Sequence, residues 1–80
     1  MTVVVRAFAG AREALGRGRI ELELPDGADV AAAWALLSAD WPGLTAVPLQ
    51  AFAVNHAYVP DSTILRHGDE LALIPPVSGG

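Results

Sequence analysis

The 80-residue chain has a formal net charge of −4, and 52% of its residues are hydrophobic. This length predicts one domain near the lower limit for a self-supporting core, and the apolar content argues against a disordered chain. The acidic balance argues against nucleic-acid binding, and the lack of cysteine excludes a disulfide framework and a zinc knuckle.

Two strands are predicted near the start of the chain. Residues 2–8 are rich in β-branched side chains and alternate roughly between an apolar and a more polar face. Phe8 falls on the polar face, which is the wrong side for a core residue. Residues 19–24 alternate between aliphatic and charged residues, and we expect them to pair antiparallel with the first strand.

The sequence predicts one main helix. Asp29 is well placed to cap it, and from Val30 the apolar residues recur at helical spacing for about 11 residues, ending before Pro42. Trp34 and Trp41 share this spacing, which favours core packing over a ligand-stacking pair. The earlier segment, residues 9–15, could form a helical turn that is weakened by a glycine.

The second half of the chain predicts a loop over residues 44–50 and a hairpin over residues 51–59 that turns at Asn55-His56. A short extended piece and a further turn lead into a last strand over residues 70–74. A single helix between strands predicts an α+β fold, with the helix packed across one face of the sheet. The last strand is expected to lie beside the first and parallel to it.

The last six residues have the character of a tail rather than of a folded element. Pro75 and Pro76 stop the last strand and stiffen its exit, and Gly79 and Gly80 end the chain as a slim thread. We therefore expect a folded domain over residues 1–74 and a flexible tail over residues 75–80 that inserts into a partner.

The sequence shows no constellation of catalytic residues. His56 and His67 both fall in predicted turns with no metal-ligand cluster beside them, so the turn interpretation is favoured and no metal is expected. Asp69 and Glu70 are neighbours on a strand and point to opposite faces, which argues against an acid/base pair. An enzyme acting alone is not indicated.

A surface next to the tail is the remaining candidate site. If the first and last strands are neighbours, Phe8 and Ile74 share the exposed face of the sheet beside the base of the tail. Tyr58 is a third candidate for this face. Exposed apolar residues that cluster beside a terminus indicate a docking surface.

The C-terminal residues resemble a known family. The stretch from Leu65, with Gly68-Asp69-Glu70 followed by Pro75-Pro76-Val77-Ser78-Gly79-Gly80, is similar to the end of the small subunit of molybdopterin synthase (MoaD type). The segments Phe8-Ala9 with Arg12-Glu13, and Val54-Asn55, extend the likeness over most of the chain. The resemblance implies a ubiquitin-like β-grasp fold and the role of a sulfur carrier.

The resemblance also implies a chemistry for Gly80. An E1-like adenylating enzyme would use ATP to convert the terminal carboxylate to an acyl-adenylate, and sulfur from a donor protein would then leave a thiocarboxylate. The tail, residues 75–80, would enter the large synthase subunit, in a complex expected to be a heterotetramer, and donate sulfur to cyclic pyranopterin monophosphate. Phe8, Tyr58 and Ile74 would contact the partner. This chain itself would bind no cofactor.

Other functions remain open at this point. A related β-grasp carrier could deliver sulfur for thiamine, cysteine or tRNA thiolation, and a ubiquitin-like modifier would be attached through Gly80 to a lysine. The longest apolar run, residues 30–37, is far shorter than the ~20 residues that span a bilayer. The start of the chain lacks the basic residues of a secretory signal, so we expect a cytoplasmic protein with no membrane partner.

Overall fold

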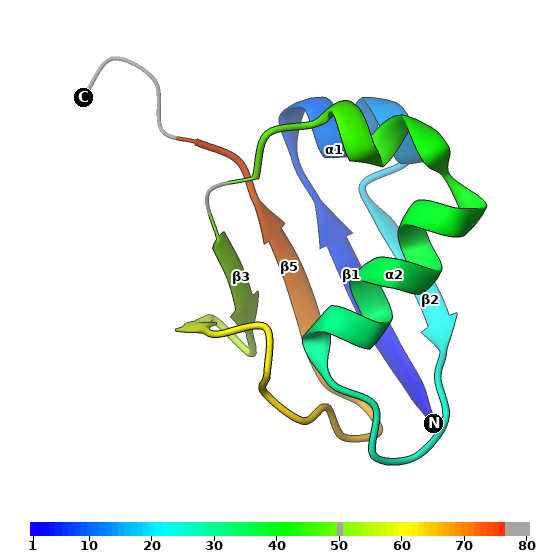
Figure 1. The fold of residues 1–80 in the computed structure, drawn as a ribbon. Helices are drawn as coiled ribbons and strands as arrows, with labels where there is room; N and C mark the ends of the chain where they lie inside the picture. Colours follow the sequence, from blue (N-terminus) through cyan, green and yellow to red (C-terminus); the bar gives the residue numbers. More distant parts are fainter. Residues whose placement is uncertain (50, 77–80) are drawn as a thin grey trace.

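The computed structural model describes residues 1–49 and 51–76, in which strands and helices are arranged as Figure 1 shows. The tail residues 77–80 lie outside the described residues, as does Gln50. The elements in chain order are β1 (Thr2–Ala7), α1 (Ala9–Leu15), β2 (Arg19–Glu23), α2 (Val30–Asp40), the 3-10 helix η1 (Pro42–Ala46), β3 (Ala51–Val54), β4 (Ala57–Val59) and β5 (Glu70–Ile74).

The strands of the described residues form one mixed sheet in the order β2-β1-β5-β3-β4. β1 pairs antiparallel with β2 and parallel with β5, and both pairings agree with the sequence prediction. β5 also pairs antiparallel with β3, which continues into the β3–β4 hairpin. The last strand of the chain is therefore the middle strand of the sheet, bonded on both sides.

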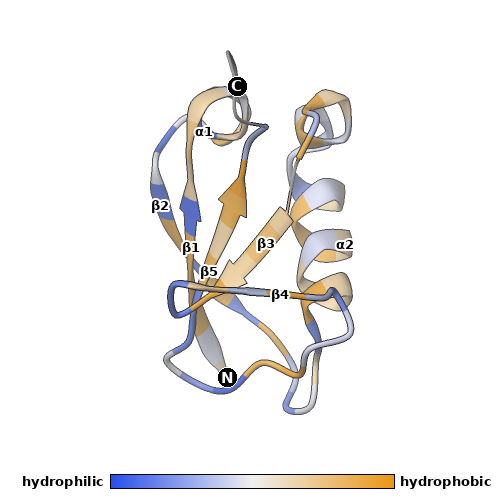
Figure 2. Ribbon diagram, turned by 90° about the vertical axis from the view of Figure 1, so that its left-hand side faces the viewer, coloured by the Kyte–Doolittle hydropathy of each residue, from blue (hydrophilic) through white to orange (hydrophobic). Residues whose placement is uncertain are grey.

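The core lies between the sheet and α2, which runs along one face of the sheet (Figures 1 and 2). Val3, Val5, Leu71 and Leu73 point toward this helix and have no exposed surface. Fully burying an aliphatic side chain of this size stabilises the fold by roughly 1.5–3 kcal/mol. The alternate residues of β1 and β5 are only partly buried, so the opposite face of these strands is open to solvent.

The start of α2 is defined by a side-chain cap. Asp29 Oδ1 accepts a hydrogen bond from the backbone N–H of Ala32 at 2.8 Å, as the sequence predicted. The helix then has 11 residues and ends at Asp40, before the predicted proline stop. Its aromatic residue Trp34 packs edge-on against Phe52, with ring centroids 5.9 Å apart. Trp34 is therefore part of the core layer, and the stacking-pair alternative is not needed.

The extended segment at residues 63–65 anchors the same end of α2. The N–H of Leu65 donates to the carbonyl of Ala28 at 2.9 Å, and the N–H of Val30 donates to the carbonyl of Thr63 at 3.0 Å. Leu65 is buried by this pairing. A short piece with weak strand character in the sequence thus closes the end of the core where α2 begins.

The prediction of a loop over residues 44–50 was wrong at its start, because residues 42–46 form η1. Pro42 has no backbone N–H to lose at the first helical position, and the N–H of Leu44 donates to the carbonyl of Trp41 at 2.9 Å. Leu44 has no exposed surface. A side chain expected in a solvated loop is instead a core residue between the helices.

The weak helical turn predicted over residues 9–15 forms the complete helix α1, so the sheet carries more than the one main helix expected. Gly10, which argued against this helix, lies where Val47 approaches it. A Cβ at Gly10 would lie 3.4 Å from a methyl group of Val47. This distance is an ordinary van der Waals contact, so the packing does not require a glycine, and the helix forms despite the low helix propensity of Gly10.

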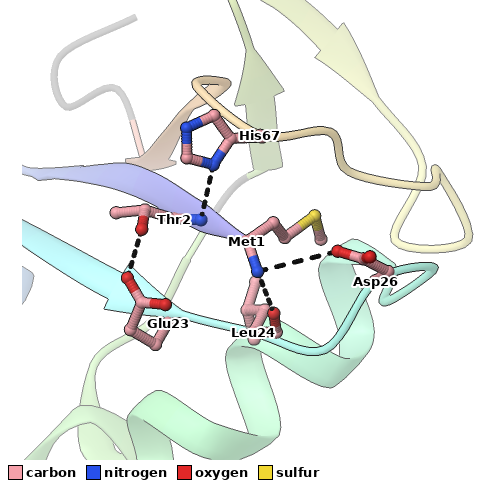
Figure 3. A network of polar contacts seen from close by, with 6 residues as sticks. All are labelled: Met1, Thr2, Glu23, Leu24, Asp26 and His67. Carbon is pink, nitrogen blue, oxygen red and sulfur yellow. Dashed lines mark hydrogen bonds and ion pairs between the residues drawn. The ribbon is translucent and has the colours of Figure 1, made fainter.

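A network of polar contacts joins β1 to β2 and to the turn before β5 (Figure 3). The backbone N–H of Thr2 donates to His67 Nδ1 at 3.0 Å, and the Thr2 hydroxyl donates to Glu23. The Met1 nitrogen donates to the Leu24 carbonyl at 2.7 Å. His67 lies in an exposed turn as expected, and it also holds β1 in place, a role that its sequence position did not indicate.

The cap of α2 provides a test of the fold. Replacing Asp29 with alanine removes the only side-chain acceptor at the first turn and should lower the free energy of unfolding by about 1 kcal/mol. Asp40→Ala is the matched control, because it makes the same change at the last residue of the helix, where a carboxylate is unfavourable to the helix dipole. Urea denaturation should show no loss for the control. Equal losses for both variants would contradict the assigned cap.

Candidate functional site

The base of the tail is defined by the middle strand. β5 ends at Ile74, the residue where the sequence predicts the folded domain to end, and Pro75 and Pro76 follow with no regular structure. Ile74 still pairs with Ala51 of β3. Because β5 is hydrogen-bonded to strands on both sides, the point from which the tail leaves is held firmly by the sheet. The predicted tail residues Val77, Ser78, Gly79 and Gly80 lie outside the described residues.

A hollow of ≈ 300 Å³ lies on the open face of the sheet beside this exit point. Four residues of adjacent strands stand in one row across it: Arg6 of β1 pairs with Ala72 of β5, Ala72 with Ala53 of β3, and Ala53 with Tyr58 of β4. The two alanines are the smallest side chains of the row, so they form its floor. The complete lining comprises Arg6, Phe8, Ala53, His56, Tyr58, Glu70, Ala72 and Ile74.

The structure brings the three predicted docking residues together at this hollow. Phe8, Tyr58 and Ile74 all line it, although Phe8 follows β1, Tyr58 lies in the middle of β4 and Ile74 ends β5. Phe8 is 43% exposed and Tyr58 is 74% exposed. Phe8 directly follows β1 in extended conformation, and the backbone turns sharply at Ala9, which has a φ of 50°. This turn starts α1 and leaves the Phe8 ring outside the core.

The hollow also has a polar side, which the sequence analysis did not assign to a site. Arg6 Nη1 lies 3.9 Å from Glu70 Oε2, and His56 Nε2 lies 4.0 Å from Glu70 Oε1. Pairs of this kind at a surface add at most about 1 kcal/mol to stability, so their main effect is to orient the side chains. Strand alternation alone would have placed Arg6 and Glu70 on the open face, but His56 reaches it only through the tight turn.

That turn is held against the start of β5 by Asn55. Asn55 and His56 have φ values of 51° and 72°, as a two-residue hairpin turn requires. The Asn55 side chain accepts from the N–H of Glu70 at 3.0 Å and donates to Asp69 Oδ1 at 2.9 Å. Asp69 Oδ2 accepts from the N–H of Arg66 at 2.8 Å. Asp69 therefore serves the turn, as the sequence predicted, rather than acid/base chemistry.

The chemistry of the hollow is that of a binding surface. Its floor and one side are apolar, and its polar side holds one guanidinium, one imidazole and one carboxylate that pair with one another. Within residues 1–49 and 51–76, no group of three or more His, Asp or Glu side chains is placed to hold a metal ion. In the same residues, no helix is both long and apolar enough to cross a bilayer.

Comparison with known proteins finds one matching family and several relatives that share one name. The model of the ThiS family matches residues 5–80. The chain is 39% identical to the molybdopterin synthase sulfur carrier subunit of Arabidopsis thaliana, covering 98% of this chain and 82% of that protein. It is 41% identical to the protein of the same name from Chlamydomonas reinhardtii, covering all of both chains, and 35% identical to that of Homo sapiens, covering 98% and 93%.

Solved structures share the fold over the whole chain. SAMP1 from Haloferax volcanii aligns with a TM-score of 0.87 at 27% identity and covers all of both chains. The small archaeal modifier protein 1 from Methanosarcina acetivorans gives 0.83 at 26% identity, covering 99% and 96%. A chain in the complex of subunits 1 and 2 of molybdopterin-converting factor from Helicobacter pylori gives 0.73 at 28% identity, covering all of both chains.

Asn55 provides a test of how the site is assembled. Asn55→Ala removes two hydrogen bonds and places a Cβ-bearing residue without a polar side chain at positive φ, so the free energy of unfolding should fall by about 2–4 kcal/mol. Asn55→Gly relieves the backbone and isolates the hydrogen bonds, so its loss should be about 1–2 kcal/mol. Urea denaturation measures both. If glycine costs as much as alanine, positive φ is not part of the role of Asn55.

Proposed function

This chain belongs to the ThiS family, and from that premise we propose that it acts as the sulfur carrier subunit of a molybdopterin synthase. The relatives that bear this name are 35–41% identical to it over nearly its whole length. The fold is the ubiquitin-like β-grasp of its structural neighbours. The structural observation that best supports the role is that the middle strand leads past the apolar hollow directly into Pro75 and Pro76.

The proposed chemistry takes place at the carboxylate of Gly80. A carboxylate is a poor acyl donor until one of its oxygens becomes part of a good leaving group. An E1-like adenylating partner supplies that group from ATP by forming an acyl-adenylate, with release of pyrophosphate. Sulfide-level sulfur from a donor protein then attacks the carbonyl carbon, so that a C–S bond forms as the C–O bond to AMP breaks. The resulting thiocarboxylate donates sulfur to cyclic pyranopterin monophosphate. The sequence contains no cysteine, so sulfur is held by the main chain and not by a side-chain thiol.

We propose that the prolines and the glycines of the tail have different roles in its insertion. Ordering a free residue costs about 1–2 kcal/mol, and the fixed φ of Pro75 and Pro76 lowers this cost before the partner is met. Val77 and Ser78 continue toward the tip. Gly79 and Gly80 let the backbone pass through a channel in which a Cβ would clash. This chain provides the tail, and the large subunit provides the site that accepts it.

The proposed partner is the large synthase subunit, in agreement with the two-subunit complex that contains the Helicobacter pylori neighbour. We propose that this subunit docks on the hollow and contacts Phe8, Tyr58 and Ile74, in a complex with two copies of each chain. The small side chains of Ala53 and Ala72 leave the floor of the hollow open to apolar side chains of the partner. We place the carrier in the cytoplasm, where ATP is available to the activating partner.

The mass of the intact chain tests the sulfur carrier role. After co-expression with the adenylating enzyme and the sulfur donor, intact-mass analysis should show the replacement of one oxygen by sulfur, and fragmentation should locate it at Gly80. A chain that stays unchanged under conditions in which a known carrier is converted would refute the sulfur carrier role.

Removal of Gly80 is the control for the same prediction. The truncated chain should transfer no sulfur, while its melting temperature stays near that of the full chain, because Gly80 lies six residues beyond Ile74, the last residue of the last strand. A large loss of stability would mean that the tail is a structural element.

The docking surface is tested by filling its floor. Ala72→Leu places a larger side chain in the hollow, which has the space for it, so stability should change little while affinity for the large subunit falls at least about tenfold. Ala35→Leu makes the same change on the exposed side of α2 and should leave the affinity unchanged. Isothermal titration measures both. Equal affinities would place the docking surface elsewhere.

A second function, that of a protein modifier, is favoured by the structural likeness to small archaeal modifier protein 1. The same C-terminal activation would then end in an amide bond to a lysine of a target protein. Blots of cells that express a tagged chain would show conjugates of higher mass if this function is present. The stronger sequence identity to the sulfur carriers makes modification the second choice.

Partners recovered from the native cell would separate the synthase from a carrier for thiamine, cysteine or tRNA thiolation, since each pathway has its own sulfur acceptor.

A further inference from the structure

The arginines of this chain are unevenly distributed. All five cationic side chains are arginine, and four of them lie between residues 6 and 19. The fold gathers these four at one end of the molecule, because β1 ends there, α1 lies there and β2 begins there (Figure 1). β5 is parallel to β1, so the tail leaves from the same end. We call the four residues, Arg6, Arg12, Arg17 and Arg19, the arginine end.

The members of the arginine end are held close together by the local structure. Arg6 and Arg19 are direct neighbours across the β1–β2 ladder. Arg17 is exposed in the turn that starts β2. The guanidinium of Arg12 lies against the same turn, since a Cβ at Gly18 would be 3.6 Å from its Cζ. Like charges placed this closely repel one another, so the cluster is not explained by the stability of the fold.

The carboxylates have the opposite distribution. Only Glu13 and Asp40 share the end from which the tail leaves, which gives that end a formal charge of +2. Of the remaining seven carboxylates, Glu21 and Glu70 stand level with Val4 in the middle of the sheet, and the other five together with Arg66 give the far end −4. The charges of the three regions, +2, −2 and −4, make the net −4 of the chain. Those five are Glu23, Asp26, Asp29, Asp61 and Asp69. A protein that is acidic overall therefore presents a basic end around its tail.

The far acidic end is separated from the arginine end by more than the screening length, while Glu70 in the middle of the sheet pairs directly with Arg6. From Arg6 to Thr2, where β1 meets Glu23, the strand rises roughly 13 Å. This exceeds the screening length of about 8 Å at physiological ionic strength. A partner that meets the tail therefore senses mainly Arg12, Arg17 and Arg19, because Arg6 is paired with Glu70. A basic partner would instead attract the acidic end, and the end that carries the tail would then face away from that partner.

We propose that the arginine end docks against a rim of carboxylates on the protein that receives the tail. The inference rests on the proposed function and adds the charge of the partner surface. A guanidinium binds a carboxylate through two parallel hydrogen bonds and stays charged at any physiological pH. The cluster adjoins the apolar hollow, because Arg6 belongs to both. Charge attraction then brings the tail end forward during the encounter, and apolar contact follows in the docked complex.

Three variants test whether the arginine end attracts the partner during association. Arg17→Glu and Arg66→Glu change the net charge equally, and both side chains are exposed, but only Arg17 belongs to the arginine end. In stopped-flow association with the large subunit at low ionic strength, Arg17→Glu should slow the on-rate by about tenfold. Arg66→Glu should leave it within about twofold of wild type, and Arg17→Gln should fall between the two. High salt should bring all four proteins to similar rates.

The outcomes separate the inference from the function on which it rests. Equal on-rates for Arg17→Glu and Arg66→Glu overturn the carboxylate rim while leaving the carrier role intact. A wild-type chain that binds neither the large subunit nor the adenylating enzyme overturns both. Melting temperatures of the variants check that each is folded.

Discussion

The position of β5 in the middle of the sheet is the constraint on which the rest of the structure depends. This strand pairs with β1 on one side and β3 on the other, and its inward residues Leu71 and Leu73 are fully buried against the helical layer. Its last residue is also the base of the tail. The most firmly held strand of the domain thus ends at the base of the tail, so the sheet fixes the point from which the proposed insertion starts.

The two faces of this strand differ in the size of their side chains and in what they contact. The inward face is filled by leucines that pack against the helical layer. The outward face offers Ala72, which lies beside Ala53, so the surface is lowest at the centre and higher at the aromatic and aliphatic residues around it. A hollow formed by small residues in the middle of a rigid sheet needs no rearrangement before a partner side chain enters it, which keeps the entropy cost of docking low.

Charge and apolar surface are arranged around the same exit point. Arg6 belongs to the arginine end and lies against Glu70 at the polar side of the hollow. The arginine end and the apolar hollow are therefore adjacent. A partner that is attracted by the arginine end is already next to the hollow. For the proposed encounters with an activating enzyme and then a receiving subunit, such an arrangement favours fast association, with release after the chemistry is complete.

Local patterns determined most of the elements of this protein. Alternation set the inward and outward faces of the strands, Asp29 and the proline stop bounded α2, and the Gly-Gly end carried the family likeness, because each of these signals lies within a few residues. Only the tertiary structure decided what distant residues do together. Leu44 became a core residue and Gly10 part of a helix because of the segments packed against them. The row from Arg6 to Tyr58 and the gathering of four arginines beside the tail depend on strand order and register, which link residues that are far apart in the chain.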